Sequence, residues 1–591
     1  VEDLADCKPE KLKSAGSFSI EGGIKPVNLF IVMKAVITIF FVVLALGLDV
    51  NAQINPEEQA KIDSIFSQWD HPGSPGAAVG IVRDGALVYS KGYGMANLDY
   101  DIPLSVTSKF YIASMAKQFT AACIALLALE GKIDLDDEVH AYIPELPSYG
   151  EMITIRNLVH HTSGLRDYLE LMYLSGRSFE DYFTINDGIQ LLRRQSDVNF
   201  SPGEKHLYSN SGYILLAEIV NRVSGMTIRE YADRNIFKPL GMNDTFFNDD
   251  HSQIIKNRVV SYRKESDTFK RYVQNFDALG DGNLITTIKD LYLWDQNFYR
   301  PKVGGAKFLD LMLTKGRLNN GDTIDYAFGL VHDTYKGLPT LSHGGAFLGF
   351  RTQFIRFPEQ RFSVIVLASV SGSNPTGKAY QIADILLKDN LSVLEPEDEK
   401  LTSFEVEPVP LTKDELRLFE ASYWSYEENY SRKIYLKSDT LRYSRGEQNE
   451  NRLLPIDRNE FQMLDVTDGL RVNFDLKYGK PYKMIVTVNG NNPSELYAYM
   501  PLEAKDQDLK ALEGSYYSKE LDCTYVLKVR LDGLVLMIND VEMGHLRPVM
   551  DGLFVIEDFG VIKFDEKNKN VFVLDANRVK QIKFSKSKTL G

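Results

Sequence analysis

The pattern of hydrophobic and polar positions predicts two β-hairpins that lie far apart in the sequence. In the first, two short apolar runs flank Asp84 and Gly85, a pair that favours a tight turn between antiparallel strands. These runs are residues 76–82 and 86–92. The second hairpin is predicted from residues 353–357 and 362–368, with a turn that begins at Pro358.

Helical spacing of apolar residues predicts helices between and after the hairpins. They cover residues 116–130, 211–223, 227–235 and 381–387. Strands at both ends of one region, with helices between them, predict a single sheet assembled from both ends and covered by helices. We therefore expect residues 53–395 to form one α/β (α+β) domain.

The pattern changes after residue 395. Residues 396–410 are acidic and contain three prolines, a composition typical of a linker. Beyond them short strands recur, and the segment that starts at Leu416 is repeated, with most positions matched, at Leu509. Two copies are too few for a solenoid. They predict two small all-β domains, barrels or sandwiches, over residues 411–502 and 503–591.

The beginning of the chain has the pattern of a secretory signal peptide. Lys34 precedes an apolar stretch over residues 35–48, and Val50 and Ala52 suit the two positions that a signal peptidase inspects. We expect cleavage after Ala52 and a periplasmic or secreted protein, and we interpret residues 1–32 as an upstream extension. A membrane anchor over residues 27–50 is the alternative, and Lys34 would make it costly.

Composition narrows the possible partners and cofactors. The 591 residues carry a formal net charge of −14, which disfavours nucleic acid as a partner, because phosphate binding requires a basic surface. The three cysteines, Cys7, Cys123 and Cys523, are too far apart for a thiolate metal site. The neighbouring His160 and His161 have no third ligand at a suitable spacing. No metal site is predicted.

Ser114 and Lys117 form the first candidate catalytic pair. They stand three positions apart where a polar segment enters a helical run, so their side chains share a face at the helix N-terminus. The helix dipole there disfavours a cationic lysine and favours a serine alkoxide. A useful base near neutral pH requires the lysine pKa to fall by about three units, which burial can provide.

Two further segments can complete such a site. Tyr208 can relay a proton beside a lysine, and the Asn210 amide can bind a substrate carbonyl. Residues 342–346, Ser-His-Gly-Gly-Ala, precede the second hairpin, and their glycines allow a substrate backbone to approach. Taken alone, the first segment could be an ordinary polar loop and the second a turn with a surface histidine.

Together the three segments, in this order and framed by the hairpins, resemble the serine β-lactamase and penicillin-binding protein superfamily. Within it, residues from about 75 to 387 are similar to the branch of class C β-lactamases, D-aminopeptidases and esterases, peptidase family S12. Four more segments carry the resemblance: Gly-Tyr-Gly at 92–94, Leu-Val-His-His-Thr-Ser-Gly-Leu at 158–165, Phe-Ser-Pro-Gly at 200–203 and Pro-Leu-Gly-Met-Asn at 239–243.

The resemblance implies a catalytic domain with an antiparallel sheet flanked by helices, followed here by two β domains. It implies acylation of Ser114, with Lys117 as the group that helps to deprotonate it, and Tyr208 as the group that shares the proton transfer and activates the deacylating water. It further implies that Asn210, His343, Gly344 and Gly345 bind the substrate, and that the Ala346 N–H joins the Ser114 N–H in an oxyanion hole. No metal and no organic cofactor is implied.

His343 departs from the β-lactamase pattern, in which a lysine usually attracts the substrate carboxylate. Histidine is mostly neutral at pH 7, and D-aminopeptidases of the branch have histidine there and two barrels after the catalytic domain.

We therefore predict an exported serine hydrolase that acts on a small amide or short peptide. An esterase or β-lactamase of the same branch is the alternative, and a penicillin-reactive binding protein without turnover is the alternative of another class. The oligomeric state is left open.

Overall fold

The computed structural model describes residues 54–392, 408–446, 449–464, 466, 469–488, 491–502, 509–531, 533–565 and 567–587. The predicted signal peptide with its cleavage site at Ala52, the residue Cys7 and most of the predicted linker lie outside the described residues. Cys123 and Cys523 are both free thiols.

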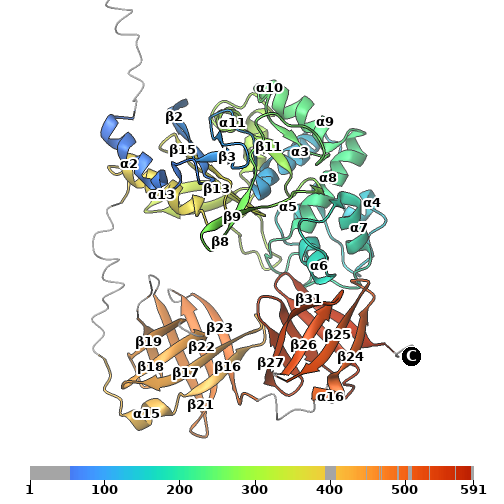
Figure 1. Ribbon diagram of the computed structural model, residues 1–591, viewed down its shortest axis with the longest axis vertical. Helices are drawn as coiled ribbons and strands as arrows, with labels where there is room; N and C mark the ends of the chain where they lie inside the picture. Colours follow the sequence, from blue (N-terminus) through green and yellow to red (C-terminus); the bar gives the residue numbers. More distant parts are fainter. Residues whose placement is uncertain are drawn as a thin grey trace, which may run out of the picture. The chain divides into compact units, whose positions relative to one another are not determined.

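One six-stranded antiparallel sheet organises the first domain, and both predicted hairpins belong to it (Figure 1). Its strands, in spatial order, are β12 (Val331–Tyr335), β13 (Leu338–Phe347), β14 (Phe350–Phe357), β15 (Phe362–Ala368), β1 (Ala77–Arg83) and β2 (Ala86–Tyr93). The pairing of β1 with β15 joins the two hairpins, from Ala77 opposite Ala368 to Arg83 opposite Phe362. The prediction of one sheet built from both ends of the region is confirmed.

Alternation along the strands directs side chains into two hydrophobic cores. Val79 and Ile81 of β1 face one core, which also contains residues of α2 (Pro56–Phe66) and α13 (Pro375–Leu386). Ala78 faces the other core, which includes Ile288 of α11 (Ile288–Asn297). Helices therefore cover both faces of the sheet, as Figure 1 shows for α13 and α11.

The remaining helices of the first domain lie between the hairpins in the sequence. Three predicted helices correspond to α3, α8 and α9, the last of which continues into a π-helical turn at Asp233–Phe237. The helices are α3 (Lys117–Leu129), α4 (Val139–Tyr142), α5 (Ile155–Val159), α6 (Tyr168–Leu174), α7 (Ile185–Arg193), α8 (Asn210–Ser224), α9 (Ile228–Ala232), α10 (Lys238–Leu240) and α12 (Gly305–Met312).

The C-terminal part forms two closed eight-stranded antiparallel barrels. The first contains β16 (Ala421–Ser425), β17 (Tyr430–Lys437), β18 (Thr440–Gly446), β19 (Asn449–Pro455), β20 (Glu460–Met463), β21 (Leu470–Lys477), β22 (Lys480–Val488) and β23 (Asn491–Tyr499). The second contains β24 (Gly514–Ser518), β25 (Cys523–Arg530), β26 (Gly533–Ile538), β27 (Val541–Met550), β28 (Leu553–Ile556), β29 (Gly560–Phe564), β30 (Val571–Ala576) and β31 (Val579–Lys586). The sequence allowed barrels or sandwiches, and both domains are barrels.

The sequence repeat marks the start of each barrel. A short helix, α15 (Lys413–Arg417) or α16 (Leu509–Leu512), precedes the first strand. The buried Tyr423 donates its hydroxyl hydrogen to the Phe419 carbonyl at 3.0 Å, and Tyr516 donates to the Leu512 carbonyl at 2.9 Å. The repeat is therefore structural, because the matched tyrosines fasten each short helix to its barrel.

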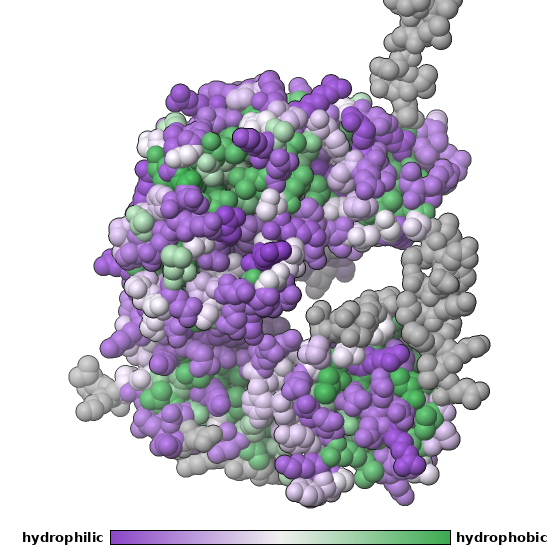
Figure 2. Space-filling view, turned by 180° about the vertical axis from the view of Figure 1, so that it is seen from behind, coloured by the Kyte–Doolittle hydropathy of each residue, from purple (hydrophilic) through white to green (hydrophobic). Residues whose placement is uncertain are grey.

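The surface in Figure 2 is mainly hydrophilic, as expected for a chain in which a quarter of the residues are charged. Hydrophilic residues predominate on the face in Figure 2, and hydrophobic residues appear on it as separate areas. None of the described helices is both long enough and apolar enough to cross a bilayer.

Candidate active site

Ser114 lies in a short 3₁₀ turn, Ala113–Ala116, directly before α3, and not inside the α-helix itself. The Ile112 N–H donates to the Leu284 carbonyl at 3.0 Å, and Ala113 has a left-handed backbone with a φ of 48°. Thr352 of β14 donates its hydroxyl hydrogen to the Ile112 carbonyl at 2.9 Å. The backbone before Ser114 is thus held both by Leu284 and by strand β14 of the six-stranded sheet, which fixes the position of the serine.

Lys117 is fully buried at the first position of α3. Its Nζ lies 3.2 Å from Ser114 Oγ, 2.8 Å from Asn210 Oδ1 and 2.8 Å from the Asp281 carbonyl oxygen. A neutral amine has two N–H groups and one lone pair. The two shorter contacts accept the two N–H groups, which leaves the lone pair to accept the Ser114 hydroxyl proton.

The protonation states favour Lys117 over Tyr208 as the base. Burial lowers the pKa of Lys117 to about 8, although Asp281 and Asp167 oppose this shift. Burial raises the pKa of Tyr208 well above its usual value of about 10, and the nearby Ser114 side chain opposes that rise. Near neutral pH a fraction of Lys117 is therefore neutral, while Tyr208 remains a phenol.

Tyr208 is positioned by His161. Their rings lie 4.2 Å apart, and the N–H of Ser209 donates to His161 Nδ1 at 3.1 Å. Lys117 Nζ lies 4.9 Å from the centre of the Tyr208 ring. The Tyr208 hydroxyl is buried and has no hydrogen-bond partner within the described part of the chain. An unsatisfied buried hydroxyl is costly, so this group is available for a substrate atom.

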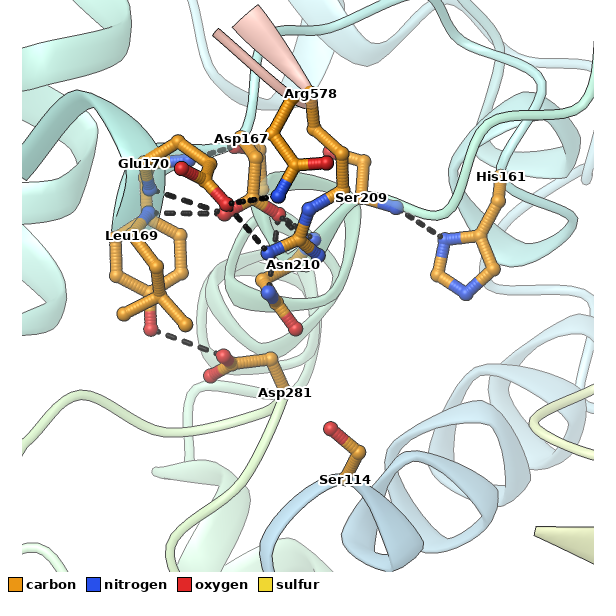
Figure 3. Close-up of polar contacts among 12 residues, drawn as sticks. Ser114, His161, Asp167, Leu169, Glu170, Ser209, Asn210, Asp281 and Arg578 are labelled. Carbon is orange, nitrogen blue, oxygen red and sulfur yellow. Dashed lines mark hydrogen bonds and ion pairs between the residues drawn. The ribbon is translucent and has the colours of Figure 1, made fainter. Parts of the chain in front are cut away.

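Asn210 is brought to Lys117, but both ends of its amide are already bonded. Its Oδ1 accepts from Lys117, while its Nδ2 and its backbone N–H donate to Asp167 Oδ2 at 3.0 and 2.7 Å. Asp167 is itself completely buried and caps α6 through Oδ1, which accepts the N–H groups of Leu169 and Glu170 (Figure 3). In this structure Asn210 orients the lysine, and its Nδ2 keeps a second N–H on the wall of the cavity that can bind a substrate.

The third segment, residues 342–346, lies in the second half of β13 and packs against the turn that contains Ser114. A Cβ atom on Gly345 would overlap the Ile112 carbonyl oxygen, so only glycine allows this approach. His343 Nδ1 contacts the Gly344 carbonyl at 2.6 Å, and its Nε2 contacts the Tyr326 hydroxyl at 3.0 Å. Burial lowers the pKa of His343 to about 4, so the ring is neutral and cannot attract a carboxylate by charge.

These residues share one cavity of about 820 Å³. Seven of the predicted site residues line it: Ser114, Tyr208, Asn210, His343, Gly344, Gly345 and Ala346. Lys117 is not part of the lining and reaches the cavity through its contact with Ser114. The other lining residues include Glu170, Phe179, Glu180, Asp281, Arg351 and Arg578. This volume is typical of a pocket for a small ligand. Within the described ranges, no three His, Cys, Asp or Glu side chains are placed to hold a metal ion.

Sequence reasoning missed three charged residues of the site: Asp167, Asp281 and Arg578. The Asp281 carboxylate accepts the Tyr168 hydroxyl at 3.0 Å, and burial raises the pKa of Asp281. Arg578 belongs to the second barrel, and its Nη1 lies 3.2 Å from Asp167 Oδ2. None of the three lies in a recognisable motif. For Asp281 alone the sequence offers an indication: it lies in the Gly-Asp-Gly-Asn segment at 280–283, whose glycines suggest that the backbone approaches another part of the chain closely.

The β-lactamase family model, described as "Beta-lactamase", matches residues 62–387. A penicillin-binding protein of Bacillus subtilis (strain 168) is 33% identical over 310 residues, which cover 48% of this chain and 66% of that protein. A D-aminopeptidase of Gluconobacter oxydans (strain 621H) is 28% identical over 319 residues, 53% of this chain and 59% of that protein. The chain therefore matches less than two thirds of the length of each of these relatives.

One solved structure, that of the octameric penicillin-binding protein homologue from Pyrococcus abyssi, aligns with a TM-score of 0.51 and 21% identity. The alignment covers 74% of this chain and 99% of that one. At this identity the likeness concerns the fold alone. The family match extends over more than half of the chain and includes all three candidate motifs. The chain therefore belongs to the β-lactamase family of serine hydrolases.

Proposed function

We propose that the protein is an exported serine hydrolase that cleaves a small amide or short peptide through an acyl-enzyme on Ser114. The observation that carries the proposal is the set of three contacts of Lys117: when the amine is neutral and its two N–H groups are bonded to Asn210 and Asp281, its lone pair points toward Ser114 Oγ. The pattern of residues 33–52 supports export.

In the first step Lys117 accepts the Ser114 proton as Oγ attacks the substrate carbonyl carbon. The negative charge moves to the carbonyl oxygen, which the N–H groups of Ser114 and Ala346 stabilise from the cavity wall. The protonated Lys117 then has three N–H groups. Asn210 Oδ1 and the Asp281 carbonyl remain two of their acceptors, so the lysine does not have to move.

In the second step the bond to the leaving nitrogen breaks and that nitrogen takes a proton. The Tyr208 hydroxyl is suited to deliver it, because it is a neutral phenol without a protein partner in the described structure and can be reprotonated from Lys117. A water molecule then attacks the acyl-enzyme with Lys117 as base, and Ser114 Oγ leaves and recovers its proton.

The cavity supports a substrate that needs no cationic anchor for a carboxylate. His343 is neutral, and the arginines on the wall are held by the protein: Arg351 donates to two backbone carbonyls, of Leu348 and Phe350, and Arg578 pairs with Asp167. Glu170 lies on the same wall and is itself paired with Arg578, at 3.4 Å from Nη2. A substrate without a carboxylate, such as an aminoacyl amide, suits these surroundings, and D-aminopeptidases are among the relatives by name.

A substrate panel tests the proposal. The chain from Gln53 onward should be assayed with D- and L-aminoacyl anilides, short esters and a chromogenic β-lactam. We expect steady turnover of an aminoacyl anilide, and faster turnover of it than of the β-lactam. Turnover of esters alone would identify an esterase. One round of acylation without product release would identify a binding protein and contradict the proposal.

A further inference from the structure

Arg578 reaches the active site from a different domain. It occupies the turn between β30 and β31 of the second barrel, and its side chain is 23% exposed on the cavity wall. Figure 3 shows Arg578 beside Asp167 and Glu170, with Asn210 and Asp281 between it and Ser114 in this view. The catalytic domain therefore does not supply the whole wall of its own cavity.

Backbone contacts fix this turn independently of the arginine side chain. The Asn199 Nδ2 donates to the Arg578 carbonyl at 2.9 Å, and the Lys580 N–H donates back to Asn199 Oδ1 at 2.9 Å. The Asp167 N–H also donates to the Arg578 carbonyl, at 3.3 Å. Substitution of the Arg578 side chain should thus leave the turn in place, so that the effect of the arginine charge can be tested by itself.

Asp167 is the group that requires the arginine. Its carboxylate is completely buried, and one of its oxygens holds both the backbone N–H and the side-chain amide of Asn210. A buried carboxylate is costly unless an opposite charge pairs with it. Arg578 Nη1, at 3.2 Å, is the cation paired with Asp167 in the described structure, and Arg578 Nη2 lies 3.4 Å from Glu170.

We propose that Arg578 is a positioning residue of the Ser114 site: by neutralising Asp167 it keeps Asn210 against Lys117 and favours the uncharged form of that lysine. The inference rests on the proposed function only in that Ser114 and Lys117 must be the reactive pair. The second barrel then completes the catalytic centre electrostatically, because the catalytic domain alone would leave Asp167 as an uncompensated negative charge.

The sign of the effect follows from the groups that face Lys117. They are Asp281, Asp167 and Arg578 as charges, and Tyr208, Tyr213, His161 and His343 as neutral titratable groups. Burial has the largest effect on the pKa of Lys117 and lowers it. Of the charged groups, the two carboxylates raise this pKa and Arg578 lowers it. Loss of the arginine leaves both carboxylates unopposed, so the lysine remains protonated to a higher pH.

The test uses a reaction that does not require the natural substrate. The full chain is labelled at Ser114 with a fluorophosphonate, and the labelling rate is measured by intact mass from pH 6 to pH 10. The variants are Arg578→Met, Arg578→Lys and the double variant Arg578→Met with Asp167→Asn. The matched control is Arg194→Met, since Arg194 pairs with Asp522 of the same barrel at 3.3 Å but does not line the cavity.

For Arg578→Met we expect the midpoint of the pH profile to rise by about one unit, which makes labelling roughly tenfold slower below the midpoint. Arg578→Lys should keep most of the wild-type profile, the double variant should recover part of it, and Arg194→Met should not shift it. A wild-type midpoint in Arg578→Met, whatever its melting temperature, would overturn the inference while leaving the proposed function intact. Failure of the wild-type chain to label at Ser114 would overturn the proposed function, and this inference with it.

Discussion

Lys117 Nζ lies 3.2 Å from Ser114 Oγ, and its other two contacts, at 2.8 Å, are both hydrogen-bond acceptors. This relationship makes the charge of the lysine decisive. The protonated form offers all its hydrogens and cannot accept the serine proton, whereas the neutral form can. Activity should therefore follow the fraction of neutral Lys117.

The first prediction is a pH profile. Because burial lowers the pKa of Lys117 to about 8, kcat/KM should rise with pH through about 8 and level off above it. Lys117→Arg, which keeps the charge but cannot act as a base, should lower kcat/KM by about 10²–10⁴-fold at every pH. A profile that is flat between pH 6 and pH 9 would contradict the assignment of Lys117 as base.

The second prediction concerns the nucleophile. Ser114→Ala should abolish covalent labelling and lower turnover at least about 10³-fold, because the acyl-enzyme can no longer form. The melting temperature should stay close to that of the wild type, since loss of the 3.2 Å contact between the hydroxyl and Lys117 removes only one hydrogen bond. Ser64→Ala, an exposed serine on α2, is the control and should label normally. Full activity of Ser114→Ala would exclude this mechanism.

The third prediction concerns the approach of β13 to the serine turn. Gly345→Ala should lower kcat/KM by about a hundredfold, because the new Cβ would overlap the Ile112 carbonyl and push Ser114 away from the oxyanion site. Gly73→Ala is the matched control, because there the nearest atom, of His71, is 3.5 Å away. Equal activity of the two variants would show that this close approach does not position the serine.

The sequence predicted those parts of the structure that local patterns determine. The turn pair Asp84-Gly85 specified one hairpin, and both residues have positive φ values, of 52° and 83°. The spacing of Ser114 and Lys117 predicted their contact. The residue pattern alone left barrels and sandwiches open for each β repeat, because closure depends on the pairing of the first and last strands, whereas the resemblance to D-aminopeptidases favoured the barrels that the structure contains.

The ionic environment of the site could not be predicted either. Asp167, Asp281 and Arg578 are widely separated in the sequence, and the folded chain alone brings them to Lys117. For Asn210 the sequence suggested an amide that binds a substrate carbonyl, but it gave no indication of the bonds to Lys117 and Asp167 that position this amide. The chemistry of a motif was thus easier to recognise than the partners that control it.

The fourth prediction concerns the attachment of the second barrel to the catalytic domain. Arg166 is 1% exposed and pairs with Glu520 of that barrel at 2.5 Å, and the same Glu520 oxygen also accepts the N–H and hydroxyl of Ser196. Glu520→Gln would leave Arg166 charged and buried without its carboxylate. Removal of one partner from a buried pair costs about 3–5 kcal/mol.

We therefore expect faster hydrogen exchange throughout residues 509–587 in Glu520→Gln, and slower labelling of Ser114, because Arg578 is carried by the same barrel. The matched control is Asp522→Asn, two residues further along, which breaks the exposed pair with Arg194 and should cost at most about 1 kcal/mol. Equal protection in the two variants would show that the buried pair does not hold the barrel. Loss of protection with unchanged Ser114 labelling would show that the barrel can detach without affecting catalysis.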